Sequence, residues 1–220
     1  SWDNSGLIVG DKAQSIDTIY LALEPTRAVI ESARENSLII THHPLIFSPL
    51  KRLEFDSYIA DIIRRVIQKN IALVALHTNY DLSHLNNFFV QRVFGLMPSR
   101  ADEFITYVDY QTDFDSRIQR LKDTLGLEHI PAVFKAGEIR SIAVVTGSGA
   151  SLLPRVTADV FITGDVKYHD AIAAQENKIG LIDVTHYASE RLFTDSMHEN
   201  LKILPIEVII TDSGNPLKYF

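Results

Sequence analysis

Residues 16–43 read IDTIYLALEPTRAVIESARENSLIITHH, and this stretch decides the fold class. Its first nine and its last seven residues are apolar, β-branched runs of the kind that form buried strands. Between them, Val29, Ile30 and Ala33 share one face of a predicted helix. A strand, a helix and a second strand in this order predict a parallel pair of strands with the helix packed on the sheet.

The same alternation continues along the chain. Further strands are expected at 71–81, 104–110, 140–151, 159–166, the start of 180–201 and 206–210, and helices at 26–36, 55–70, 85–96, 114–127, 168–178 and the rest of 180–201. Asp113 or Asp115 is the expected cap of the helix at 114–127. The sequence therefore predicts two similar α/β lobes with mostly parallel sheets flanked by helices, residues 1–100 and 101–220, with the final strand in either lobe.

The composition indicates an ordinary soluble protein that can bury a substantial core. Its 21 basic and 28 acidic residues give a net charge of -7 without long runs of like charge, which disfavours nucleic acid and anionic membranes as partners. No apolar stretch reaches the roughly 20 residues of a bilayer span, and the first ten residues lack a signal-peptide pattern. We therefore expect a cytoplasmic protein.

Three predicted strands end in side chains that can bind metal ions. The three groups are His42 with His43, His77 with Asp81, and His186 with Glu190. Ligands of open α/β sheets bind beyond the carboxyl ends of the strands. Each group alone also fits a plainer role, such as a hydrogen-bonded cap or a surface ion pair. Their occurrence at three equivalent strand ends favours a metal site.

The donor set predicts more than one ion. Four histidines and two carboxylates exceed the three or four protein ligands of a tetrahedral zinc, and they suit two ions about 3.5 to 4 Å apart. The chain has no cysteine, so thiolate ligands are excluded. Imidazole and carboxylate together favour Zn, Mn or Fe(II) over Ca or Mg. We expect two divalent ions, and the choice of metal stays open.

Five motifs, in order along nearly the whole chain, carry a resemblance to a known family. They are WDNSGLIVG (2–10), ITHHPLIF (40–47), LHTNYD (76–81), TGDVKYHDA (163–171) and THYASE (185–190). These motifs resemble the Nif-three-like family, also named GTP cyclohydrolase I type 2 homologues. The resemblance implies two α/β lobes that face each other across a cleft with a dinuclear metal site, and subunits assembled as a toroidal hexamer.

Matched onto this chain, the resemblance also implies the ligands of that site. They fall on His42, His43, Asp81, His186 and Glu190. His77 lies at or just outside this ligand set. One departure is that the Gly-His-Tyr of the family is Thr185-His186-Tyr187 here.

Other residues are candidates with two open interpretations. Asp165 and His169 can contact ligands or substrate, or they can belong to a turn and a capped helix. Residues 146–151, TGSGAS, resemble an anion-binding glycine turn but lack the lysine of a P-loop, so a plain turn is the alternative. Asp3 and Asn4 are candidates to line the cleft.

The leading functional hypothesis is a metal-dependent hydrolase in which two ions activate a shared water for attack on a nucleotide or a phosphoester. The cyclohydrolase name implies a purine ring as the target. His77 or His169 is the candidate proton shuttle. The alternative is a non-catalytic protein that binds or delivers metal, or a ring-shaped scaffold, and a metal-free α/β binding domain is a third possibility.

Overall fold

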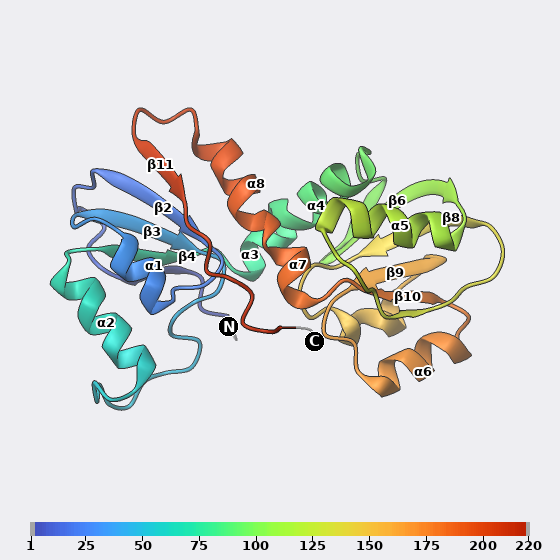
Figure 1. Ribbon diagram of the computed structural model, residues 1–220, viewed down its shortest axis with the longest axis horizontal. Coiled ribbons are helices and arrows are strands. Elements are labelled where there is room, and N and C mark those ends of the chain that lie inside the picture. Colours follow the sequence, from blue (N-terminus) through green and yellow to red (C-terminus); the bar gives the residue numbers. More distant parts are fainter. Residues whose placement is uncertain (1–2, 219–220) are drawn as a thin grey trace. The chain divides into compact units, whose positions relative to one another are not determined.

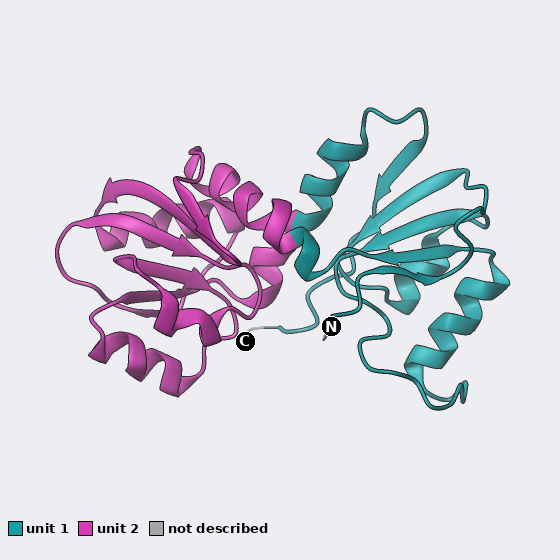
Figure 2. Ribbon diagram, turned by 180° about the vertical axis from the view of Figure 1, so that it is seen from behind, with its two compact units in different colours: residues 1–80, 193–220 teal, residues 81–192 magenta. Residues whose placement is uncertain are grey.

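The computed structural model describes residues 3–218 of the chain (Figure 1). The chain forms two compact units, which Figure 2 distinguishes by colour. Unit 1 comprises residues 1–80 and 193–220, and unit 2 comprises Asp81–Leu192. The division therefore falls twenty residues before the expected boundary at residue 100, because the helix that follows residue 85 packs on the second sheet rather than the first.

The sheet of unit 1 has five strands in the order β1-β4-β3-β2-β11. They are β1 (Gly6–Val9), β2 (Thr18–Ala22), β3 (Ser37–Thr41), β4 (Ala72–Ala75) and β11 (Glu207–Ile210). Strands β11, β2, β3 and β4 run parallel, and β1 is antiparallel to β4 at one edge. The final strand thus joins the sheet of unit 1, beside β2.

Two helices cover one face of this sheet. They are α1 (Arg27–Ser32) and α2 (Tyr58–Gln68), and their N-caps Thr26 and Ser57 accept hydrogen bonds from the first turn. Val29 and Ile30 of α1 share a core with Tyr20 and Ala22, alternate residues of β2. The predicted helical faces are therefore confirmed. Figure 1 shows both helices on the same side of the strands.

The sheet of unit 2 has six strands in the order β5-β6-β8-β9-β10-β7. They are β5 (Arg100–Asp102), β6 (Ile105–Thr112), β7 (Ala132–Val133), β8 (Ile139–Val144), β9 (Val160–Thr163) and β10 (Gly180–Asp183). The three central strands, β8, β9 and β10, run parallel, whereas the outer pairings are antiparallel. The expectation of a mostly parallel sheet therefore describes unit 1 and the centre of unit 2.

Helices lie on both faces of the second sheet (Figure 1). The helical segments of this part of the chain are η1 (Asp81–Leu85), α4 (Asn86–Phe94), α5 (Phe114–Leu125), η2 (Ala150–Arg155), α6 (Tyr168–Glu176) and α7 (His186–Glu190). Asp113, one of the two expected caps, accepts a hydrogen bond from the backbone of Ser116 (2.8 Å) at the start of α5. The remaining helices are α3 (Thr78–Tyr80) and α8 (Leu192–Leu201). Within residues 3–218, no helix is both long and apolar enough to cross a membrane.

Candidate metal centre

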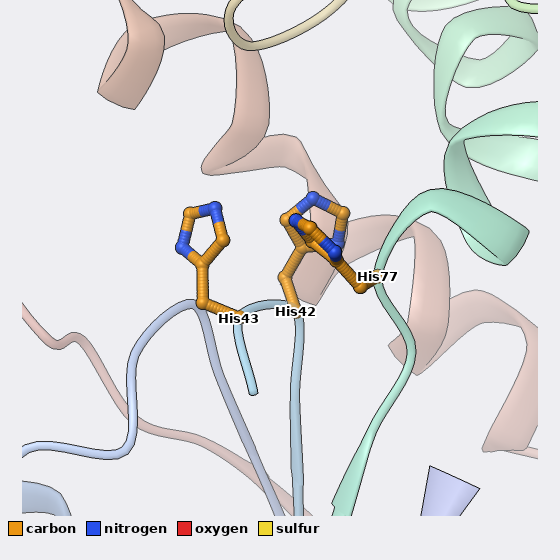
Figure 3. Close-up of side chains that lie close together, drawn as sticks. All are labelled: His42, His43 and His77. Atoms are coloured by element: carbon orange, nitrogen blue, oxygen red, sulfur yellow. The ribbon is translucent and has the colours of Figure 1, made fainter. Parts of the chain in front are cut away.

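Three histidines meet at the carboxyl edge of the first sheet. His42 and His43 follow β3, and His77 follows β4, its parallel neighbour. The ring centroids of His42 and His43 are 4.9 Å apart, and the ring of His77 lies 5.4 and 5.5 Å from them (Figure 3). One ring nitrogen of each residue lies within 4.8 Å of the others, so this three-histidine cluster can hold a metal ion.

The backbone beyond β3 explains how adjacent imidazoles can converge. The amides of His42 and His43 still donate to the carbonyl oxygens of Ala22 and Leu23 at the end of β2 (3.3 and 3.1 Å). The Thr41 hydroxyl donates to the carbonyl oxygen of His43 (2.8 Å) and holds the chain past the strand end. The two ring centroids therefore lie only 4.9 Å apart, although successive residues of a strand point to opposite faces.

An oxygen atom binds Nδ1 in each ring of the cluster. These oxygens are the carbonyl of Leu76 for His42 (2.9 Å), Oε1 of Glu24 for His43 (2.6 Å) and Oδ1 of Asp3 for His77 (2.7 Å). Carbonyl and carboxylate oxygens accept, so Nδ1 is the protonated nitrogen of each neutral imidazole. The lone pair of Nε2 is then the one that each ring can offer to a metal ion.

Electrostatics keep the Asp3–His77 contact in this form. Burial opposes ionisation of Asp3, but hydrogen bonds from Thr78, His77 and Ser5 outweigh it and lower the pKa of Asp3 to about 2. Burial lowers the pKa of His77, and the neighbouring Asp3 opposes this only in part. His77 is therefore a neutral imidazole near pH 7, which is the state that binds metals.

A second donor pair lies in unit 2, on the short helix α7. His186 and Glu190 are four residues apart, and Nε2 of His186 lies 2.8 Å from Oε2 of Glu190. Nδ1 of His186 lies 2.7 Å from Oδ2 of Asp165. The hydrogen bond to Glu190 is the largest influence and raises the pKa of His186 to about 9 against the opposing effect of burial, with Asp165 adding to the shift. A cation bound between Nε2 and Glu190 would take the place of that proton.

Two glycines make room for this His–Glu pair. A Cβ on Gly147, which follows β8 with a φ of +68°, would overlap Oε1 of Glu190. A Cβ on Gly164, which follows β9, would lie 2.6 Å from the backbone nitrogen of His186. Since real Cβ contacts are not this short, Gly164 leaves room for the backbone at the start of α7, and Gly147 leaves room for the Glu190 carboxylate.

The same contacts bear on the glycine turn at 146–151. The amide of Gly147 donates to Oγ of Ser189 (2.9 Å), and the amide of Gly149 donates to Oγ1 of Thr163 (2.9 Å). These two amides are therefore already engaged by side chains of α7 and β9. The turn therefore supports α7 and β9, these two amides are not available to a phosphate, and the anion-binding interpretation stays a prediction.

Backbone strain directly precedes His186. Thr185 has φ +66° and ψ 153°, a conformation that a β-branched residue rarely adopts. Its amide donates to Oδ1 of Asp183 (2.8 Å), and its Oγ1 accepts from the amide of Ala188 (3.3 Å) as the N-cap of α7. These two bonds hold Thr185 in this conformation.

Two other predicted site residues, Asp81 and His169, belong to no candidate metal group within residues 3–218. Asp81 is the first residue of η1, which continues directly from α3 four residues after His77, and its role as a ligand stays a prediction. His169 is exposed on the first turn of α6, with its ring 5.4 Å from that of Tyr168. No candidate metal group within residues 3–218 includes His169, and its role as a proton shuttle stays a prediction.

Sequence reasoning missed Glu24. This residue lies just beyond β2, and β2 pairs with β3 in the register Ala22↔Thr41. Two residues further along each strand, Glu24 therefore faces His43 at the same edge of the sheet. Its position at the end of a third parallel strand was the available signal.

The donor chemistry fits the expected kind of metal. Each unit supplies imidazole nitrogens, unit 2 adds the Glu190 carboxylate, and no thiolate is present in the sequence. First-row divalent ions such as Zn, Mn and Fe(II) accept this mixture of nitrogen and oxygen ligands.

Comparison with known proteins identifies the class. Residues 1–216 match the family Duf34/NIF3 (NGG1p interacting factor 3), and the chain belongs to this family. A relative from Campylobacter jejuni, named GTP cyclohydrolase 1 type 2 homolog, is 47% identical over 222 residues, which cover 100% of this chain and 92% of the relative. A Helicobacter pylori protein named GTP cyclohydrolase 1 type 2 is 42% identical, with 99% and 90% covered.

Solved structures agree with this assignment. The hypothetical protein SA1388 of Staphylococcus aureus is 27% identical with a TM-score of 0.85, covering 100% of this chain and 93% of that one. HcgD from Methanocaldococcus jannaschii is 27% identical with a TM-score of 0.82, covering 96% and 89%. The resemblance that the five motifs carry is thus confirmed, and so is the α/β fold with two sheets.

Proposed function

We propose that this protein is a hydrolase that depends on divalent metal and acts on a nucleotide, in the manner that the names of its C. jejuni and H. pylori relatives indicate, or on a phosphoester. The observation that carries the proposal is the three-histidine cluster, in which every Nδ1 is bound by an oxygen. Imidazole nitrogens brought this close together form a group that can hold a metal ion.

In this proposal, the protein binds two divalent ions. The ligands are His42, His43, Asp81, His186 and Glu190. When bound, divalent ions of this type lower the pKa of a coordinated water and polarise the group under attack.

The residues of the chain then have distinct tasks. His77, oriented by Asp3, offers Nε2 as a proton acceptor next to the site. His169 is the second candidate for moving protons, and its exposure on α6 leaves it free to exchange them with solvent. The buried ring of His42, packed 5.1 Å from Phe193, is fixed and serves binding only.

Assembly and location follow the family resemblance. We propose a toroidal hexamer of this chain that works in the cytoplasm. Size-exclusion chromatography with light scattering tests the assembly, and a monomer at all concentrations would contradict it.

The test of the proposed activity is a turnover screen. Protein loaded with Zn, Mn or Fe(II) is incubated with GTP, other nucleotides and model phosphoesters, and products are separated by chromatography. The proposal expects turnover that disappears in His43→Ala and Glu190→Gln and persists in His129→Ala, a change at an exposed histidine outside both donor groups. Metal binding without any turnover would instead favour the non-catalytic metal-binding or scaffold alternative.

A further inference from the structure

Three carboxylates stand behind three of the four histidines. Glu24, Asp3 and Asp165 bind Nδ1 of His43, His77 and His186 at 2.6, 2.7 and 2.7 Å. They come from three separate stretches of the chain: before β1, after β2 and after β9. Each contact joins a carboxylate oxygen to the same ring nitrogen at nearly the same distance, which indicates a shared role.

Neighbouring residues constrain two of these carboxylates, Asp3 and Asp165. Oδ2 of Asp3 also accepts hydrogen bonds from the hydroxyls of Ser5 (2.7 Å) and Thr78 (2.6 Å), and only 14% of its side chain is exposed. Asp165 takes a positive φ of 56° directly after Gly164, the residue that lets the His186 backbone pass close by. The Asp3 carboxylate is thus held in place by two groups other than its histidine.

We propose that Asp3, Glu24 and Asp165 are positioning residues. Glu24 and Asp165 direct Nε2 of His43 and His186 toward the metal and add negative charge behind these donor rings, and Asp3 directs Nε2 of His77 toward the same site. This inference rests on the metal site of the proposed function and does not depend on which reaction it performs.

The physical reason is twofold. A fixed acceptor at Nδ1 selects one tautomer and stops rotation of the ring, so the ring loses less conformational entropy when it binds a metal. A charged acceptor also makes the imidazole a stronger donor than a neutral acceptor does. His42 supplies the internal contrast, because its Nδ1 is held by the Leu76 carbonyl, which orients the ring without a charge.

The experiment separates orientation from charge by pairs of variants. Asp3→Asn, Glu24→Gln and Asp165→Asn keep an amide oxygen that can accept from Nδ1, whereas alanine at the same positions removes the acceptor. Zinc affinity of the full chain is measured by competition with a chromogenic chelator, and nitrogen NMR of the histidine rings reports the tautomer. Neither readout requires turnover.

We expect Glu24→Ala and Asp165→Ala to bind zinc about 10- to 100-fold more weakly, and the affected histidine in each of the three alanine variants to show mixed tautomers. The amide variants should keep the tautomer and lose a smaller part of the affinity. Asp102→Asn and Glu207→Gln are the controls, because each removes an exposed carboxylate that pairs with an arginine, Arg155 or Arg34. Both controls should bind zinc like the parent.

The positioning role and the metal site can each be contradicted, and the outcomes differ. If the parent binds zinc and the folded alanine variants match it in affinity and tautomer, the positioning role is overturned and the metal site stands. If the parent itself binds no zinc, the proposed function and the inference fall together. An alanine variant that does not fold, by circular dichroism, is replaced in the comparison by its isosteric amide variant.

Discussion

The carboxylate of Glu190 lies against Gly147, in space that a Cβ at position 147 would fill. We therefore expect Gly147→Ala to displace Glu190 and weaken metal binding at least tenfold. The positive φ adds a backbone cost of about 1 to 2 kcal/mol. Gly126→Ala is the matched control: its φ is +66°, and nothing lies within 4 Å of the added Cβ. Equal metal affinity in both variants would contradict the steric account.

The strained backbone of Thr185 leads us to expect that replacing this residue with glycine stabilises the protein. Thr185→Gly relieves the strained φ of +66° before His186, at the loss of an N-cap hydroxyl that glycine replaces at a cost of only a few tenths of a kcal/mol. We expect the free energy of unfolding in urea to rise by about 1 kcal/mol. Thr185→Ala, which loses the cap and keeps the strain, should instead lower it by about 1 kcal/mol. Equal stability of the two variants would count against strain at this residue.

Asp61 is expected to contribute to the loss of folding stability at acid pH. Hydrogen bonds from Arg64, then Arg65 and Arg27, hold the pKa of this nearly buried carboxyl far below its usual value. Because the folded pKa is depressed, this stabilisation is present above the unfolded pKa of about 3.9 and is lost as pH falls below it toward the folded pKa.

We expect Asp61→Asn to be less stable than the parent at pH 7 and to lose less stability between pH 5 and pH 2. Urea unfolding at several pH values measures both effects. Glu54→Gln, at an exposed carboxylate paired with Arg52, should leave the pH profile unchanged. Parallel profiles for the parent and Asp61→Asn would show that the arginines do not hold this pKa.

Arg117 is a buried cation between two rings. Its guanidinium lies 4.8 Å from the ring of Phe94 and 4.2 Å from that of Tyr110, and burial lowers its pKa to about 10. Within residues 3–218 it has no carboxylate in a salt bridge. We expect Arg117→Met, which keeps most of the volume, to be neutral or more stable by about 1 to 2 kcal/mol, and Arg117→Ala to be about 2 to 4 kcal/mol less stable. A large loss in Arg117→Met would show that the ring contacts outweigh desolvation.

Much of the fold was readable because the long elements have strong periodicity. The β-α-β stretch at 16–43 gave the correct parallel pairing, and Asp113 proved to be the cap of α5. The short strands were missed. Strand β1 has four residues and begins at a glycine with φ +117°, and β7 has only two residues, so neither has enough alternation to recognise.

The site was readable to the extent that strand ends identify it. His42, His43 and His77 meet as a cluster because β3 and β4 are parallel neighbours, and that follows from the order of elements. Glu24 and the steric role of Gly147 were not readable, because they depend on strand register and on close packing between turns far apart in the sequence.

Metal content of the full chain tests the central claim most directly. Protein purified without added metal or chelator, and again after incubation with Zn, Mn and Fe(II), is measured by plasma mass spectrometry beside the double variant His43→Ala, Glu190→Gln. The account predicts about two equivalents of metal in the parent and their loss from a variant that remains folded. A parent that holds almost no metal under every one of these conditions would contradict it.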